Sequence, residues 1–191
     1  MKHLLALLLI ASSSVALTSS QSQPLEGEAL FTALRGGGFV FFFRHARTDF
    51  SQMDVAGNDL NDCAKQRNLS ADGRVQSTAI GEAMRQRRIP VSRVLVSPYC
   101  RTRETARLAF PAFSLEVSKD LVGGISERCA ACLRTLLSIT PAPRTNTVLV
   151  SHQFNFRDVT DLSLEEGEAA VVQPLGTSGF RVVARVTSDA W

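Results

Sequence analysis

Three groups of polar residues in this 191-residue sequence have the types and the placement for chemistry on an anion. Each group follows a short apolar run: Arg44-His45 after FVFFF, Ser97 and Arg101 after VSRVLV, and Ser151-His152 after TNTVLV. A guanidinium makes fixed, forked hydrogen bonds to phosphate or carboxylate. An imidazole can act as a nucleophile or carry a proton near neutral pH. Two arginines and two histidines brought together in this way would suit a phosphate group.

The same residues have a structural interpretation. A buried charge without a partner is very costly, so each cation at a strand end would need a carboxylate. Asp49 is the only acid close to these strand ends. Ordinary ion pairs and hydrogen-bonded core histidines are therefore the alternative to a functional site.

The apolar runs predict the strands that would position these residues. Residues 39–43, 91–98 and 145–152 are short, continuous apolar segments bounded by glycine, proline or polar residues, which is typical of buried strands. Helical patterns occupy 28–35, 70–88, 100–110 and 126–139, and 114–121 has the pattern of a further strand. In 70–88, Ser70 is a helix cap, and Val75, Ala79, Ile80, Ala83 and Met84 have helical spacing.

Strands that alternate with helices predict an α/β fold with a mainly parallel central sheet and helices on both faces. Residues 167–186 instead predict two strands joined as a C-terminal β-hairpin on that sheet. Ligands of open parallel sheets bind beyond the carboxyl ends of the strands, where the polar groups would meet. Because no linker or repeat divides the chain, we expect residues 21–191 to form a single domain.

Residues 1–20 predict a secretory signal peptide. Lys2 precedes an apolar centre from Leu4 to Ile10, and small residues follow, with cleavage expected between 16 and 23. A membrane anchor is the alternative, but the apolar run is shorter than the roughly 20 residues that span a bilayer. We therefore expect an exported protein, periplasmic or secreted, without stable membrane insertion after cleavage.

The charge of the chain argues against nucleic acid as a partner. The formal net charge is +3, and Lys65 and Lys119 are the only lysines beyond the expected signal peptide, so arginine carries nearly all the positive charge. No basic stripe with interleaved aromatic residues is present, as would be typical of a nucleic-acid surface.

Four cysteines, at 63, 100, 129 and 132, would form two disulfides in an exported protein. Three pairings are possible, and the sequence alone does not choose among them. Cys129-Ala-Ala-Cys132 has the spacing of a redox or metal motif. That role is less favoured, because the motif falls in a helical pattern and no second cysteine pair completes a zinc site.

The order of the motifs resembles a known family. RHA at 44–46, SPYCRTRETA at 97–106, VSH at 150–152 and the helical segment RNLSADGRVQSTAIGEAMR at 67–85 resemble the histidine phosphatase superfamily, also called phosphoglycerate mutase-like, in its small single-domain branch. The resemblance extends from Phe39 to His152. It implies that His45 is the nucleophile, that Arg44 and Arg101 bind phosphate, and that His152 is a second catalytic and phosphate-binding histidine.

The general acid is less clear from the resemblance. In small-branch enzymes this acid commonly lies some way beyond the second arginine, and Glu127 falls in that interval after a Gly-Gly pair. Glu127 can equally be an acid in the first turn of a helix capped by Ser126. Asp49 is the alternative acid, because it follows His45 by four residues, and Glu104 is less favoured because it lies inside the helix after Arg101.

Some positions depart from the usual family pattern. Ala46 replaces the more frequent glycine, and Ser151 and Gln153 replace a common glycine and asparagine without removing a catalytic group. Arg47 stands where an acid or amide is common. It would either extend the anion site or be a solvated loop arginine.

The resemblance also suggests a role for two cysteines. Cys63 lies in the long loop after the nucleophile, and Cys100 immediately precedes Arg101. A Cys63–Cys100 disulfide would hold that loop beside the phosphate pocket. Cys129 and Cys132 would then pair, although a disulfide within one helical turn is strained.

Taken together, the resemblance implies a phosphatase that hydrolyses phosphate monoesters through a covalent phospho-histidine, without a metal or other cofactor. The expected substrate is a phosphorylated small molecule or glycan. A non-catalytic anion-binding module of the same fold and a phosphotransferase are the alternatives.

Overall fold

A six-stranded sheet forms the centre of the computed structural model, which describes residues 25–57, 59–123 and 128–191. The strands are β1 (Val40–Arg44), β2 (Val91–Val96), β3 (Leu115–Val117), β4 (Asn146–Ser151), β5 (Ala169–Pro174) and β6 (Phe180–Val186). Their order is β3-β2-β4-β1-β5-β6, with β1 to β4 parallel and β5 antiparallel to both β1 and β6. The predicted mainly parallel sheet with a C-terminal hairpin is confirmed. The expected signal peptide lies outside the described residues.

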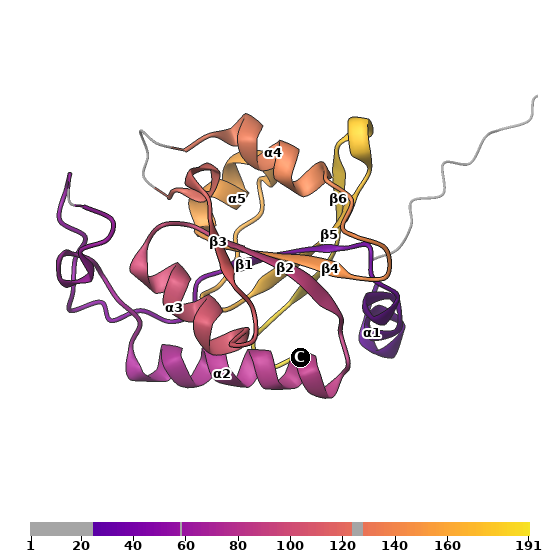
Figure 1. Cartoon of the computed structure of the whole chain (residues 1–191), viewed down its shortest axis with the longest axis horizontal. Coiled ribbons are helices and arrows are strands. Elements are labelled where there is room, and N and C mark those ends of the chain that lie inside the picture. Colours follow the sequence, from indigo (N-terminus) through magenta and orange to yellow (C-terminus); the bar gives the residue numbers. More distant parts are fainter. Residues whose placement is uncertain (1–24, 58, 124–127) are drawn as a thin grey trace, which may run out of the picture.

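Helices cover both faces of the sheet, as predicted (Figure 1). They are α1 (Gly27–Gly36), α2 (Ala71–Gln86), α3 (Cys100–Ala109), α4 (Ala130–Ser138) and α5 (Gln153–Thr160), with short 3-10 helices η1 (Cys63–Lys65), η2 (Lys119–Leu121) and η3 (Gly176–Ser178). In Figure 1, α2 lies below the sheet, and α4 and α5 lie above it. The sequence analysis did not predict α5. Among the described residues, no helix has the length and apolar character needed to cross a membrane.

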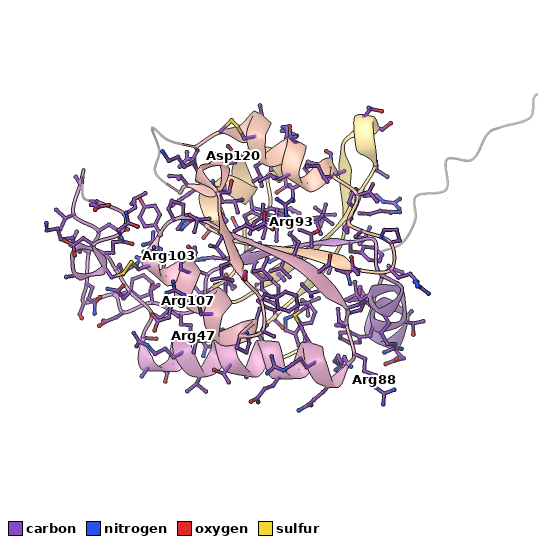
Figure 2. All side chains as sticks on the ribbon, viewed as in Figure 1. Arg47, Arg88, Arg93, Arg103, Arg107 and Asp120 are labelled. Carbon is purple, nitrogen blue, oxygen red and sulfur yellow. A yellow bond between two sulfur atoms is a disulfide. The ribbon has the colours of Figure 1, made fainter. Side chains whose placement is uncertain are left out.

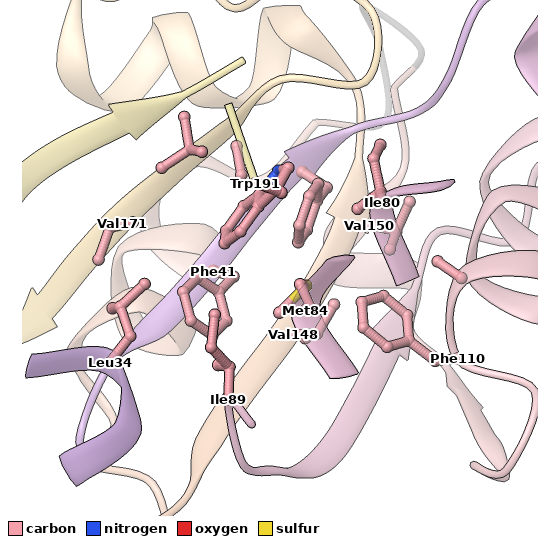
Figure 3. Close-up of a cluster of buried hydrophobic side chains, with 14 of the residues drawn as sticks. Leu34, Phe41, Ile80, Met84, Ile89, Phe110, Val148, Val150, Val171 and Trp191 are labelled. Carbon is pink, nitrogen blue, oxygen red and sulfur yellow. The ribbon is translucent and has the colours of Figure 1, made fainter. Parts of the chain in front are cut away.

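The apolar run that becomes β1 is buried on both sides. Phe41 and Phe43 pack into the core beneath α1, α2 and α3, whereas Val40 and Phe42 pack into the core beneath α4 and α5. Trp191 closes the first core, with its ring centroid 5.8 Å from that of Phe41 (Figure 3). A strand covered on both faces has to be apolar at every position, which explains the unbroken run.

The helix α2 packs differently from its apolar pattern. Of the five apolar residues with helical spacing, Ile80 and Met84 are buried, whereas Val75 is 71% exposed and Ala79 is also exposed. The buried face includes Gln76, whose Oε1 accepts a hydrogen bond from the Arg47 backbone N–H and whose Nε2 donates to the Glu166 carbonyl. A buried polar side chain with hydrogen-bond partners thus shares the inner face of this helix with Ile80 and Met84.

Two disulfides join the four cysteines (Figure 2). The structure pairs Cys63 with Cys100, whose Cα atoms lie 5.7 Å apart, and Cys129 with Cys132, at 5.1 Å. The helix α4 begins at Ala130, later than expected, so Cys129 precedes it. The disulfide therefore joins the N-cap residue of α4 to the first turn of that helix.

Candidate active site

The carboxyl ends of β1, β4 and β2 bring the predicted polar groups side by side. Arg44 is in register with Ser151, and the His45 backbone N–H donates to the Ser151 carbonyl at 3.0 Å. The Ser97 backbone N–H likewise donates to the Val150 carbonyl at 3.0 Å. Three segments that are far apart in the sequence therefore meet at one edge of the sheet, as expected for a ligand site.

A cavity of about 390 Å³ opens at this edge. The four residues assigned to the phosphate pocket, Arg44, His45, Arg101 and His152, all line it. His45 and His152 are buried, and their ring centroids lie 5.5 Å apart. The geometry thus gathers two imidazoles and two guanidiniums around one space.

The backbone fixes the orientation of the His45 ring. The Nδ1 atom of His45 lies 2.9 Å from the carbonyl oxygen of Ala46. Because a carbonyl oxygen only accepts hydrogen bonds, the proton belongs on Nδ1 and the lone pair on Nε2. Burial, followed by the positive charge of Arg101, holds the pKa of His45 well below its usual range. An uncharged imidazole with a free Nε2 is suited to nucleophilic attack.

His152 is held by three neighbours. Its Nε2 lies 2.9 Å from the Ser97 hydroxyl, its ring packs edge-on against Tyr99, and a Cβ on Gly123 would lie 2.5 Å from its ring carbons. Burial, followed by the positive charge of Arg101, keeps the pKa of His152 well below its usual range. A dianion in the cavity would oppose these effects and favour the protonated, donating form.

Arg44 is anchored by residues that follow β4 and precede β5. Its Nη1 donates to the Gln153 side-chain oxygen and to the Leu164 carbonyl, both at 2.8 Å. Its Nη2 lies 3.4 Å from Glu166 Oε1. These contacts fix the plane of the guanidinium at the cavity wall.

Arg101, at the start of α3, is only 6% exposed. Its Nη1 donates to Asp54 Oδ1 at 3.0 Å, and its guanidinium lies over the Tyr99 ring at 4.4 Å. Its Nε is buried and has no hydrogen-bond partner among the described residues. Since buried donors are normally satisfied, this atom is suited to an oxyanion.

Three charged residues of the site were not found from the sequence. Asp54 and Arg67 line the cavity from the loop between β1 and α2, and Glu166 lies behind Arg44. The Thr48 hydroxyl and backbone N–H both donate to Glu166. Glu166 shortly precedes β5. Because β5 runs antiparallel to β1, the start of β5 lies beside the end of β1. Recognition of that antiparallel pairing could have found it.

The two candidate acids have different outcomes. Glu127 lies outside the described residues. Asp49 accepts hydrogen bonds from Ser51 and Gln52 and does not line the cavity. The hydrogen bonds from Ser51 lower the pKa of Asp49, which disfavours it as a proton donor.

Arg47 and Glu104 both lie outside the cavity lining. Arg47 is exposed, which places it with the solvated loop arginines (Figure 2). Glu104 forms an ion pair with Arg74 at 2.7 Å. Within the described ranges, no cluster of histidine, cysteine, aspartate and glutamate side chains could hold a metal ion.

Comparison with known proteins agrees with this geometry. Residues 40–122 match the model of the histidine phosphatase superfamily, branch 1, a span that includes Arg44, His45 and Arg101. This part of the chain is therefore similar to the histidine phosphatase superfamily. No curated protein matches the chain.

Solved structures share the histidine phosphatase fold at low sequence identity. The protein histidine phosphatase SixA, solved with tungstate, is 18% identical, with a TM-score of 0.57 over 79% of this chain and 97% of that one. A mycobacterial glucosyl-3-phosphoglycerate phosphatase, solved with VO3, is 14% identical, with a TM-score of 0.58 over 78% and 98%. A phosphoserine phosphatase mutant from Entamoeba histolytica, solved with phosphoserine, is 8% identical, with a TM-score of 0.55 over 80% and 98%.

Proposed function

We propose that this protein is a histidine phosphatase, which hydrolyses phosphate monoesters through a covalent phospho-histidine on His45. One observation carries the proposal: the Nδ1 atom of the buried His45 is hydrogen-bonded to the Ala46 carbonyl, and two guanidiniums line the same cavity. This arrangement leaves Nε2 as the nucleophilic atom.

The first step transfers the phosphoryl group to the enzyme. The Nε2 lone pair of His45 forms a bond to phosphorus while the bond from phosphorus to the ester oxygen breaks. Arg44 and Arg101 hold the phosphoryl oxygens, and His152 donates to them once it is protonated. The general acid gives its proton to the departing alcohol.

The second step returns the enzyme to its starting state. The deprotonated acid removes a proton from water, whose oxygen attacks phosphorus as the bond to His45 breaks. Inorganic phosphate leaves, and His45 is again uncharged at Nε2. Glu127 is the proposed acid, and Gly123, four residues before it, lines the cavity.

The proposed chemistry uses no metal. In phosphoryl transfer a cation is needed to neutralise charge on the oxygens. Here the permanent charges of Arg44 and Arg101 supply it, and no redox step occurs.

The ligands of the three solved structures support a phosphorylated substrate in general. Those structures contain tungstate, VO3 and phosphoserine, which are oxyanions or a phosphate ester. For this chain we propose a phosphorylated small molecule or glycan.

Export is part of the same proposal. Two disulfides favour an oxidising compartment, and residues 1–20 have the pattern of a signal peptide. Expression of the full chain in a bacterium should yield a processed protein in the periplasm or medium. N-terminal sequencing should place its first residue after a cleavage site between 16 and 23.

Hydrolysis of an aryl phosphate by the processed protein, with EDTA present, tests the activity. We expect turnover that His45→Ala abolishes and that Arg107→Ala, a charge removal on the outer side of α3, leaves unchanged (Figure 2). Phosphate binding without turnover would instead indicate an anion-binding module. Transfer to an added alcohol in preference to water would indicate a phosphotransferase.

A further inference from the structure

Arg67 lines the same cavity as His45 and His152, and the mechanism above gives it no role. Its Nε atom is buried and has no hydrogen-bond partner among the described residues. Arg44 and Arg101 each have a carboxylate within ion-pair distance, Glu166 and Asp54 respectively. No such carboxylate is found for Arg67 in the ranges that the structure describes. It is therefore the cavity-lining guanidinium whose charge is left uncompensated there.

The surrounding loop holds Arg67 in place. Its guanidinium lies over the Phe50 ring, 4.8 Å from the centroid, and Phe50 is 71% exposed. Its backbone N–H donates to Asp54 Oδ1 at 2.9 Å, and its carbonyl accepts from Arg101 Nη1 at 3.4 Å. Phe50 thus presents the guanidinium, while Asp54 ties the backbone of Arg67 to Arg101.

The charge of Arg67 acts on the whole pocket. It contributes to the lowered pKa values of His45 and His152, and it also lowers those of Arg44 and Arg101. Arg67 lines the cavity on which these four residues converge. Three cations around one small cavity repel one another, and a bound dianion relieves that repulsion.

We propose that Arg67 is a third phosphoryl-binding guanidinium, which donates to a phosphoryl oxygen of the substrate together with Arg101. The proposal deepens the function given above and rests on it. Phe50 is then a positioning residue, which keeps the Arg67 guanidinium over the cavity.

Calorimetric titration of the processed protein with inorganic phosphate tests this role. Loss of a charge-assisted hydrogen bond predicts that Arg67→Ala binds phosphate roughly tenfold to a hundredfold more weakly. Arg67→Lys keeps the positive charge but not the forked donors of the guanidinium, so its affinity for phosphate should lie between those of the wild type and Arg67→Ala. Arg107→Ala, on an exposed position of α3 outside the cavity lining, should bind like the wild type. An unchanged affinity in Arg67→Ala overturns the proposal.

A second readout separates this role from damage to the loop. Burial chiefly, and to a lesser extent the charge of Arg67, lowers the pKa of His45, so an NMR titration of phosphate-free protein should show His45 titrating at higher pH in Arg67→Ala than in Arg67→Lys, which keeps the charge. A disordered loop that merely exposes the site would give the same loss of affinity in Arg67→Lys as in Arg67→Ala, and that result would also overturn the proposal.

Phosphate binding does not require turnover, so the two proposals fail separately. Wild-type protein that binds phosphate through Arg67 but hydrolyses no ester contradicts the proposed function alone. If the wild type hydrolyses esters and Arg67→Ala binds phosphate as tightly as the wild type, this inference alone is contradicted. Wild-type protein that neither binds phosphate nor turns over contradicts both.

Discussion

Glu166 lies behind Arg44, with its Oε1 atom 3.4 Å from Arg44 Nη2. Both side chains are largely buried, so the carboxylate is an effective counter-ion that keeps the guanidinium facing the cavity. The same oxygen lies 3.9 Å from His45 Nδ1. One residue outside the cavity lining therefore supports two residues inside it.

Replacing Glu166 by glutamine should weaken catalysis without unfolding the protein. We expect kcat/KM to fall roughly tenfold to a hundredfold, because Arg44 loses a charged partner. Steady-state kinetics on an aryl phosphate measure this change. Glu165→Gln removes the same charge from the neighbouring exposed position and should have a much smaller effect. Equal effects of the two substitutions would contradict a specific role for Glu166.

The sequence predicted the strand ends of the site but not the residues that support them. Arg44, His45 and His152 follow continuous apolar runs, whose local pattern is sufficient to identify buried strands. Glu166 lies more than a hundred residues beyond Arg44 and contacts it only because β5 returns antiparallel to β1. Such a contact leaves no local pattern in the sequence.

The errors in the helices have similar causes. Val75 has helical spacing with Ile80 and Met84 but is exposed, whereas the polar Gln76 is buried and hydrogen-bonded on the inner face of α2. The helix α5 was missed because QFNFRDVT is short and mixes polar with aromatic residues. Tertiary contacts outweigh local pattern in both cases.

Gly123 should be essential for the position of His152. A Cβ at this position would lie 2.5 Å from the ring carbons of His152, which Ser97 and Tyr99 hold from other sides. We expect Gly123→Ala to lower kcat/KM on the order of a hundredfold by displacing the ring. Gly36→Ala is the control, because a Cβ there meets nothing within 4 Å. Full activity of Gly123→Ala would show that His152 does not need its observed position.

The Cys63–Cys100 disulfide should stabilise the protein more than Cys129–Cys132. Its cysteines are 37 residues apart, against 3 for the second pair, and cross-links over longer loops remove more entropy from the unfolded chain. We expect Cys63→Ser with Cys100→Ser to lower the free energy of unfolding by about 3–4 kcal/mol in urea denaturation. Removing the Cys129–Cys132 pair should cost less, and the reverse order would contradict this account.

Stability should fall as the pH is lowered through the titration of unfolded histidine. The folded protein keeps His45 and His152 uncharged well below the usual range, whereas the unfolded chain takes up protons near about pH 6.5. Below that pH the unfolded state binds more protons, so the free energy of unfolding decreases by up to about 1.4 kcal/mol per pH unit for each histidine. Urea denaturation at several pH values measures the slope.

A double variant provides the control for the pH effect. His45→Asn combined with His152→Asn removes the two buried histidines but leaves the carboxylates, so its stability should depend less on pH in this window. An identical pH dependence of the variant and the wild type would show that other groups cause the loss.

The central claim is that His45 carries the phosphoryl group during turnover. The most direct test is to mix the processed protein with an excess of aryl phosphate, quench it rapidly in alkali, in which phospho-histidine survives, and locate the modification by peptide mass spectrometry. We predict one phosphoryl group on His45, absent from His45→Ala and unchanged in Arg107→Ala. Turnover with no phosphorylated intermediate, or with the phosphoryl group on another residue, would contradict the mechanism.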